Sequence, residues 1–116
     1  MAGGLSGLSR ENRLRKPYEF RRVRAEGRRI ASSAFLLVKA DRIEGKNPRL
    51  GLVVSRRVGN AVVRNALKRG IREWFRLEGQ ELLGAADLVV VARVRAAGLK
   101  GRRLRAQLNG QLGDLS

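Results

Sequence analysis

Residues 55–76, SRRVGNAVVRNALKRGIREWFR, combine side-chain types and a spacing that suit phosphate binding. An α-helix turns by about 100° per residue, so a helix starting near Asn60 would carry its cations on one face and its apolar side chains on the other. Like charges on one face repel one another unless an anion lies against them, and a nucleic-acid backbone is the obvious extended anion. The cationic face would hold Arg64, Asn65, Lys68, Arg69, Arg72 and Arg76, and the apolar face Val63, Leu67, Ile71 and Trp74.

A solvated surface helix is the alternative interpretation of this stripe. Surface helices usually mix acids and bases as i, i+4 pairs, whereas Glu73 is the one acid between Gly45 and Leu77. The composition also favours a nucleic-acid partner, because 26 Lys and Arg stand against 10 Asp and Glu, for a net charge of +16. Residues 1–29 carry nine cations and three acids, and residues 49–76 carry eight and one. Both regions should therefore face a common polyanion.

Side chains for protein-based phosphodiester hydrolysis are missing. The chain has no His and no Cys, which excludes an imidazole base, a zinc finger and a disulfide framework. The ten acids are scattered, and no pair has the spacing of a two-metal site. Glu78 and Glu81 lie at i, i+3, which we interpret as a solvated helix end. The sequence therefore predicts neither a catalytic residue nor a metal ligand.

The chain length suits one domain, with residues 1–9 as a flexible Gly- and Ser-rich tail and residues 10–116 as the folded part. The longest apolar run, residues 88–92, is far too short to cross a membrane. The N-terminus lacks the charged start and apolar stretch of a secretion signal. We therefore expect a cytoplasmic protein with no membrane partner.

Apolar patterning predicts an α+β domain. Pro17 and Gly27 suit the start and end of a first helix. Residues 34–40 and 49–55 are strand candidates that we expect to pair as a hairpin, joined by a loop over residues 41–48. Residues 88–94 are typical of a central strand that is buried on both faces.

Leu104, Leu108 and Leu112 repeat every four residues and predict a final helix. The predicted order α, β, β, α, β, α indicates a single-domain mixed β-sheet with helices packed on it.

Three stretches together resemble the protein subunit of bacterial ribonuclease P. They are residues 12–27 (NRLRKPYEFRRVRAEG), residues 49–76 (RLGLVVSRRVGNAVVRNALKRGIREWFR) and residues 87–93 (DLVVVAR). The middle stretch is the most specific, because a strand, a basic turn, a Gly-Asn cap and an R-N-x-x-K-R-x-x-R-E run follow in fixed order. The family's Arg-Asn-Arg triplet reads Arg64, Asn65 and Ala66 here, so one of its cations is absent.

This resemblance implies a ribosomal protein S5 domain 2-like fold with a left-handed βαβ crossover. It also implies a protein subunit, one per RNA, that binds the catalytic RNA of ribonuclease P and the 5′ leader of precursor tRNA, and so assists removal of the leader. Catalysis would then belong to the RNA with its Mg²⁺, and the protein would bind no cofactor and be inactive alone.

Two groups of residues are candidates for these contacts. The basic stripe and the turn before it would bind the catalytic RNA through Arg56, Arg57, Arg64, Asn65, Lys68, Arg69 and Arg72. A cleft between the first helix and the sheet would bind the leader through Arg13, Lys16, Tyr18, Phe20, Phe35 and Lys39. In this cleft the aromatic rings would stack on bases and the cations would hold the backbone.

Several of these residues have other interpretations. Asn65 could instead form a local hydrogen bond, and Phe20 and Phe35 could be core residues. Trp74 lies on the apolar face, so we expect it in the core. For the whole chain, the main alternative is an RNA-binding ribosomal or RNA-assembly protein without enzymatic function. A DNA-binding helix is less well supported because no helix-turn-helix spacing precedes residue 60, and a free-standing ribonuclease lacks acid–base residues.

Overall fold

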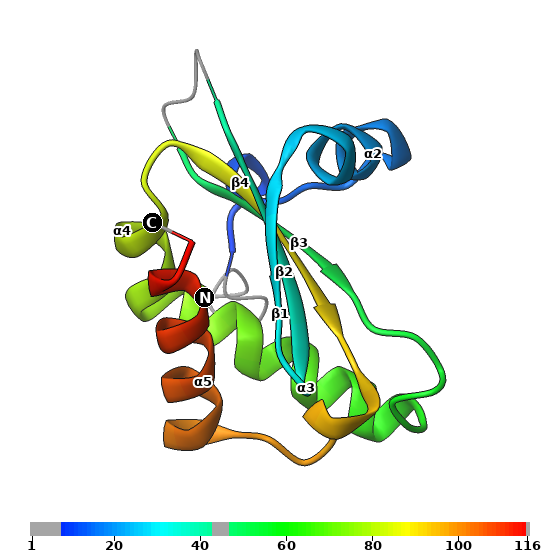
Figure 1. Ribbon diagram of the computed structural model, residues 1–116. Coiled ribbons are helices and arrows are strands. Elements are labelled where there is room, and N and C mark those ends of the chain that lie inside the picture. The colour runs from blue at the N-terminus through cyan, green and yellow to red at the C-terminus, as the bar shows by residue number, and fades with distance from the viewer. Residues whose placement is uncertain (1–7, 43–46, 116) are drawn as a thin grey trace.

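The protein folds as a four-stranded sheet with helices on both faces, and the computed structural model describes residues 8–42 and 47–115 (Figure 1). The expected tail falls mostly on residues 1–7, and the expected loop partly on residues 43–46, which lie outside the described residues. Leu8 is buried in the main core, so the folded part begins before Arg10. The elements are η1 (Arg10–Asn12), α2 (Pro17–Glu26), β1 (Arg28–Ala31), β2 (Phe35–Asp41), β3 (Arg49–Val53), α3 (Ala61–Trp74), η2 (Phe75–Gly79), α4 (Gln80–Leu83), β4 (Ala86–Ala92), η3 (Val94–Ala96) and α5 (Gly101–Gly113).

The strand order β1-β2-β4-β3 differs from the expected pairing. β4 pairs with β2 antiparallel and with β3 parallel, so it separates the two strands that we expected to form a hairpin. That expectation is wrong, and β2 instead forms its hairpin with β1. The sequence of β1, RRIA, has three exposed side chains and only a half-buried Ile30, so it lacks the apolar alternation that marks a strand. The predicted class, a mixed sheet with packed helices, is confirmed.

Two apolar layers lie on opposite faces of the sheet. The larger is formed with α3 and α5, and the smaller with α2, which covers only part of its face (Figure 1). Side chains alternate along β4: Leu88 and Val90 join the larger layer and Val89 joins the smaller. All three are fully buried, which confirms the predicted central strand buried on both faces, although β4 spans Ala86–Ala92 and not residues 88–94.

The central helix begins where the sequence predicted. Asn60 caps α3, because its side-chain Oδ1 accepts a hydrogen bond of 3.0 Å from the backbone N–H of Val63. Trp74 is fully buried and donates a 2.6 Å hydrogen bond from Nε1 to Asn109 Oδ1, which confirms it as a core residue. The buried face fixes the rotation of α3 about its axis and turns the cationic stripe outward.

The predicted final helix is α5, and its leucines are buried against the larger layer. A Cβ atom on Gly70 would lie 2.7 Å from Cδ2 of Leu104. The glycine inside α3 therefore costs helix stability but lets α5 pack closely.

Candidate nucleic-acid interface

The cationic face of α3 points away from both apolar layers. Arg56, Arg57, Asn65 and Arg69 are exposed, whereas Arg64, Lys68 and Arg72 are half-buried. Within the described part of the chain, none of these cations has a carboxylate partner. Arg76 differs, because it pairs with Glu73 at 2.6 Å. The unpaired stripe therefore runs from the turn before α3 to Arg72.

Asn65 does not form the local hydrogen bond that we considered as an alternative. Its side chain is exposed and has no hydrogen-bond partner among the described residues. Arg64, one residue earlier, donates from Nε to the carbonyl oxygen of Gly59 at 3.1 Å. That bond holds Arg64 against the start of the helix. The side chain of Asn65, by contrast, is free to bind a partner.

A small pocket joins the two groups of candidate residues. It has a volume of about 140 Å³ and is lined by Arg13 and Phe20 from the leader group and by Lys68 and Arg72 from the stripe. The chain around Arg13 reaches this place because residue 13 forms a parallel bridge with Leu50 of β3. The remaining lining is apolar and comes from Leu8, Leu14, Leu50 and Leu52.

Charge in this pocket is unbalanced. The Nε of Arg13 is buried and has no hydrogen-bond partner. Burial lowers the pKa of Arg72, and the nearby charge of Arg13 lowers it further. Two guanidinium groups that repel each other in a partly apolar pocket concentrate positive charge there, and a phosphate group would neutralise that charge.

Other members of the leader group lie beside a second, larger pocket. This pocket of about 450 Å³ lies next to η1 and the start of α2, and Arg13, Lys16 and Tyr18 line it. Tyr18 is 58% exposed, and the Nζ of Lys16 lies 6.0 Å from its ring centroid. An exposed ring with a cation beside it suits a nucleotide, which offers a base to the ring and a phosphate to the cation.

Phe35 and Lys39 are not part of this arrangement, and both expectations need correction. Phe35 is fully buried among the side chains packed with α3 and α5. Side chains alternate along β2, so Lys39 lies on the same face as Phe35, whereas Val38 lies on the face of α2. Phe35 is therefore a core residue, and Lys39 is on the wrong side of the sheet for the cleft.

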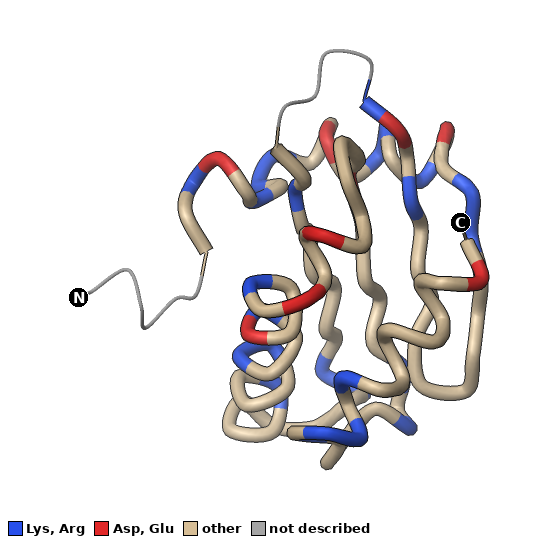
Figure 2. The backbone as a smooth tube through the Cα atoms, turned by 90° about the vertical axis from the view of Figure 1, so that its left-hand side faces the viewer, with Lys and Arg blue, Asp and Glu red and all other residues tan. Residues whose placement is uncertain are grey.

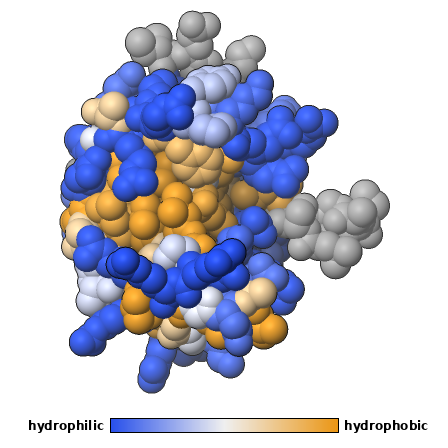
Figure 3. Space-filling model, turned by 90° about the vertical axis from the view of Figure 1, so that its right-hand side faces the viewer, coloured by the Kyte–Doolittle hydropathy of each residue, from blue (hydrophilic) through white to orange (hydrophobic). Residues whose placement is uncertain are grey.

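The exposed part of the α2 face supplies apolar surface of which the sequence singled out only Phe20. Half-buried side chains there are Phe20, Leu36, Val53 and Val91. Figure 3 shows an apolar patch in the middle of this side of the molecule, with hydrophilic residues above and below it. Phe20 also lies over Gly51, where a Cβ atom would meet its ring at 2.6 Å. The sequence shows that the side chains of Leu36, Val53 and Val91 alternate with their strand neighbours. It does not show which face of the sheet α2 leaves open.

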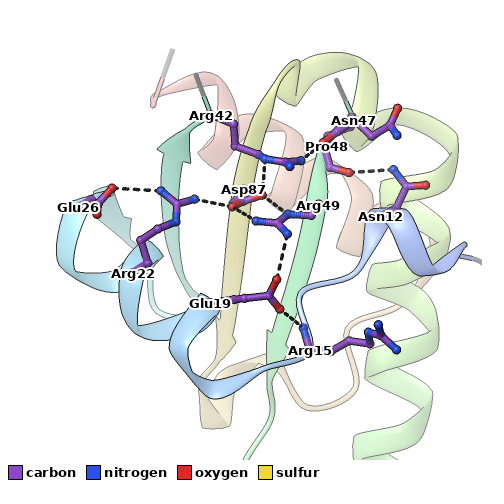
Figure 4. A network of polar contacts seen from close by, with 10 residues as sticks. All are labelled: Asn12, Arg15, Glu19, Arg22, Glu26, Arg42, Asn47, Pro48, Arg49 and Asp87. Carbon is purple, nitrogen blue, oxygen red and sulfur yellow. Dashed lines mark hydrogen bonds and ion pairs between the residues drawn. The ribbon is translucent and has the colours of Figure 1, made fainter. Parts of the chain in front are cut away.

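Asp87 forms the centre of an ion-pair network at the opposite end of the sheet from the turn before α3 (Figure 4). Its carboxylate is fully buried and accepts bonds from Arg49 at 2.8 and 2.7 Å and from Arg22 at 2.5 Å. Arg42 lies 3.7 Å away. The hydrogen bond to Asp87 is the main reason that the pKa of Arg49 is raised. These residues come from α2, β3, β4 and the chain just after β2, so no local pattern could reveal them.

A second carboxylate connects this network to the N-terminal segment. Glu19 pairs through Oε2 with Arg49 at 3.0 Å, and its Oε1 accepts bonds from the backbone N–H groups of Arg15 and Lys16, both at 2.9 Å. Burial opposes ionisation of Glu19, but the two amides and Arg49 together lower its pKa. Asp87, Arg49 and Glu19 thus fix the backbone that carries Lys16 beside the larger pocket.

Known proteins have similar sequences and the same fold. The sequence model of the family described as Ribonuclease P matches residues 8–116. The chain belongs to the ribonuclease P protein family. It is 42% identical over 104 residues to the ribonuclease P protein component of Desulfovibrio desulfuricans, covering 87% of this chain and 80% of that protein. The corresponding protein of Bacillus pumilus is 40% identical over 92 residues, or 79% of this chain and 77% of that protein.

Solved structures agree with this assignment. The ribonuclease P protein of Staphylococcus aureus superposes with a TM-score of 0.81 at 33% identity, covering 89% of this chain and 94% of that one. The Thermotoga maritima protein gives 0.79 at 29% identity, covering 90% and 97%. The chain is thus the protein subunit of a ribonucleoprotein that processes tRNA, and the ribosomal and DNA-binding alternatives are set aside. No helix in the described residues is long and apolar enough to cross a membrane.

Proposed function

We propose that this ribonuclease P protein holds two RNA segments at once, the catalytic RNA on α3 and the 5′ leader of precursor tRNA on the open face of the sheet. The convergence of Arg13, Phe20, Lys68 and Arg72 in one pocket carries the proposal. In this pocket the Nε of Arg13 has no hydrogen-bond partner and Arg13 and Arg72 repel each other, so a phosphate would be a suitable ligand. The stripe extends from this pocket along α3, and the apolar patch extends from it across the sheet.

The proposed leader site consists of Phe20, the apolar patch around it and the two cationic pockets. A single strand binds such a surface by laying bases on apolar or aromatic side chains while cations follow its backbone. Tyr18 offers a second ring in the larger pocket, which Arg13 and Lys16 also line. Phe20 is the one aromatic side chain on the patch, so stacking depends mainly on this residue.

We assign the chemistry to the RNA subunit and its Mg²⁺, with one protein per RNA. The absence of His from the sequence supports this assignment, since no imidazole can move a proton. The carboxylate of Asp87 is fully buried and its oxygens accept hydrogen bonds from arginines, so they are not available to a metal ion or a substrate. The protein would instead neutralise phosphates where RNA segments crowd together, and so lower the Mg²⁺ concentration that cleavage requires.

A single-turnover cleavage assay on precursor tRNA at low Mg²⁺ tests this proposal. It compares bacterial ribonuclease P RNA alone, the protein alone and the two together. We expect strong cleavage only from the mixture. Cleavage by the protein alone would place the chemistry on this chain. If the protein did not increase the cleavage rate of the RNA, it would be an RNA-binding module without this role.

Replacing Phe20 by Ala should weaken binding of precursor tRNA with a leader by roughly 5- to 150-fold, equivalent to about 1–3 kcal/mol for one stacked base. Leaderless tRNA should bind almost as before, and fluorescence titration of the reconstituted enzyme with both RNAs measures the difference. Phe35→Leu is the matched control, because it alters an aromatic residue on the other face. Equal losses for both RNAs in Phe20→Ala would show that Phe20 acts only in packing.

A further inference from the structure

Five cations lie beyond the proposed sites, in the segment that leaves β4 and begins α5. We call them the strand-end surface: Arg93, Arg95, Lys100, Arg102 and Arg103. All five side chains are exposed, and none has an ion-pair or hydrogen-bond partner among the described residues. The sequence has no acid between Asp87 and Asp114. Arg105, two residues further on, does find a partner, since it pairs with Glu78 at 3.2 Å.

The sheet brings this surface to the same end of the molecule as the turn before α3. β3 and β4 are parallel, and Val53 at the end of β3 pairs with Val91 near the end of β4. The chain therefore leaves both strands at the same end of the sheet, where Arg56 and Arg57 follow β3 and Arg93 follows β4. Figure 2 shows Lys and Arg at this lower end of the molecule without Asp or Glu, whereas both kinds occupy the upper end.

Helix stability does not account for these cations. Lys100 stands at the N-cap of α5 and makes no side-chain capping bond, and the first turn contains no acid. Cations at a helix N-terminus oppose the helix dipole, so Arg102 and Arg103 disfavour the helix that carries them. At the other end of the sheet, by contrast, Arg22 and Arg49 are paired with buried or half-buried carboxylates.

We propose that the strand-end surface is a second contact for the phosphate backbone of the catalytic RNA, separate from the cations on α3 itself and joined to them through Arg56 and Arg57 in the turn before α3. The proposal rests on the function proposed above. Residues 93–103 contain no aromatic side chain, so this surface would bind the phosphate backbone of the RNA without stacking on bases. The catalytic RNA would then cover the end of the sheet where β3 and β4 finish, and the leader would bind the apolar patch.

Charge-matched variants test the strand-end surface. Arg95→Gln/Arg102→Gln/Arg103→Gln removes three charges from it, and Arg21→Gln/Arg24→Gln/Arg28→Gln removes three exposed charges from α2 and β1 as a control. Affinity for ribonuclease P RNA is measured over a range of salt concentrations. The first variant should reduce the slope of log affinity against log salt by about 2.7, at about 0.9 for each lost phosphate contact, and lose about 500-fold in affinity at 0.1 M salt. Equal changes in the two variants would mean that only net charge matters, and would overturn the proposal.

Directed RNA cleavage provides a second measurement that does not depend on affinity. The chain has no Cys, so a single Cys at the exposed Ala97 or at the exposed Ala66 of α3 can carry an iron chelate that cuts nearby RNA. We expect cuts from position 97 in a segment of the catalytic RNA different from that cut from position 66. Absence of cuts from position 97 would overturn the proposal, whereas absence from both positions would instead contradict the function proposed for α3.

Discussion

Replacing Lys68 and Arg72 together by Gln should weaken binding of ribonuclease P RNA by about 100-fold at 0.1 M salt. Each lost phosphate contact removes about 0.9 from the log–log salt slope, which corresponds to about tenfold in affinity between 1 M and 0.1 M salt. The two residues lie in the pocket that joins the stripe to the cleft. Filter binding or fluorescence titration over a salt series measures both the loss and the expected change of slope, about 1.8.

The same variant should fold at least as stably as the parent protein. In the unbound protein, burial and the charge of Arg13 both disfavour the charged form of Arg72, as its lowered pKa shows. A shorter, neutral amide relieves this repulsion, so the thermal midpoint should stay constant or rise. Loss of binding with retained stability identifies a binding site that is strained in the absence of its ligand. A fall in stability in parallel with affinity would contradict this interpretation.

Arg21→Gln/Arg24→Gln is the matched control for this experiment. Both arginines are exposed on α2, and neither side chain has a partner among the described residues. The control lowers the net charge by the same amount without touching the pocket. If it weakened RNA binding as much as Lys68→Gln/Arg72→Gln does, a general attraction of the basic protein to RNA would explain the result.

The central helix could be predicted from the sequence because all of its determinants are local. Asn60 caps it, and the i, i+4 spacing of Leu67 and Ile71 places their side chains on one buried face. Once that face is buried, the outward direction of Lys68 and Arg72 follows from geometry alone. The stripe was therefore located correctly, together with the core position of Trp74.

Strand order and strand faces could not be predicted in this way. β4 lies between β2 and β3 although it follows them by more than thirty residues in the chain, and pairings so distant leave no local pattern. Phe35 and Lys39 were assigned to the cleft by residue type, but a strand alternates faces, and only the packing of α2 over Val38 shows which face is which.

The network around Asp87 illustrates the same limit more strongly. In sequence, Asp87 looks like a polar residue at the start of an apolar strand, and its arginine partners lie 38 to 65 residues away. Only the assembled sheet places these groups within hydrogen-bonding distance of one another. A buried carboxylate with several guanidinium partners is therefore a tertiary feature whose importance can be tested directly.

Replacing Asp87 by Asn should lower the free energy of unfolding by about 3–5 kcal/mol. The amide has the same shape, but it removes the negative charge that faces Arg22, Arg42 and Arg49. Three partly exposed cations would then remain close together around a buried neutral amide. Since small domains are typically stable by about 5–15 kcal/mol, urea denaturation should show a large fall in the midpoint.

Glu26→Gln is the control for this second experiment, because it removes an acid that also pairs with Arg22 but is 63% exposed. Exposed pairs contribute about 0–1 kcal/mol, so this variant should unfold almost as the parent does. A change below about 1 kcal/mol in Asp87→Asn would show that water solvates the arginines and that the carboxylate is not needed.

The network should also affect RNA binding, through Glu19. When Asn replaces Asp87, Arg49 loses one of its two hydrogen bonds and the ion pair to the carboxylate. It then holds Glu19 less firmly, so the backbone at Arg15 and Lys16 is less fixed. At a temperature where Asp87→Asn remains folded, binding of the leader should therefore weaken, whereas the α3 stripe, which lies outside the network, should bind the catalytic RNA as before. Equal weakening of both interactions would mean that the network supports the whole fold and does not specifically position the N-terminal segment.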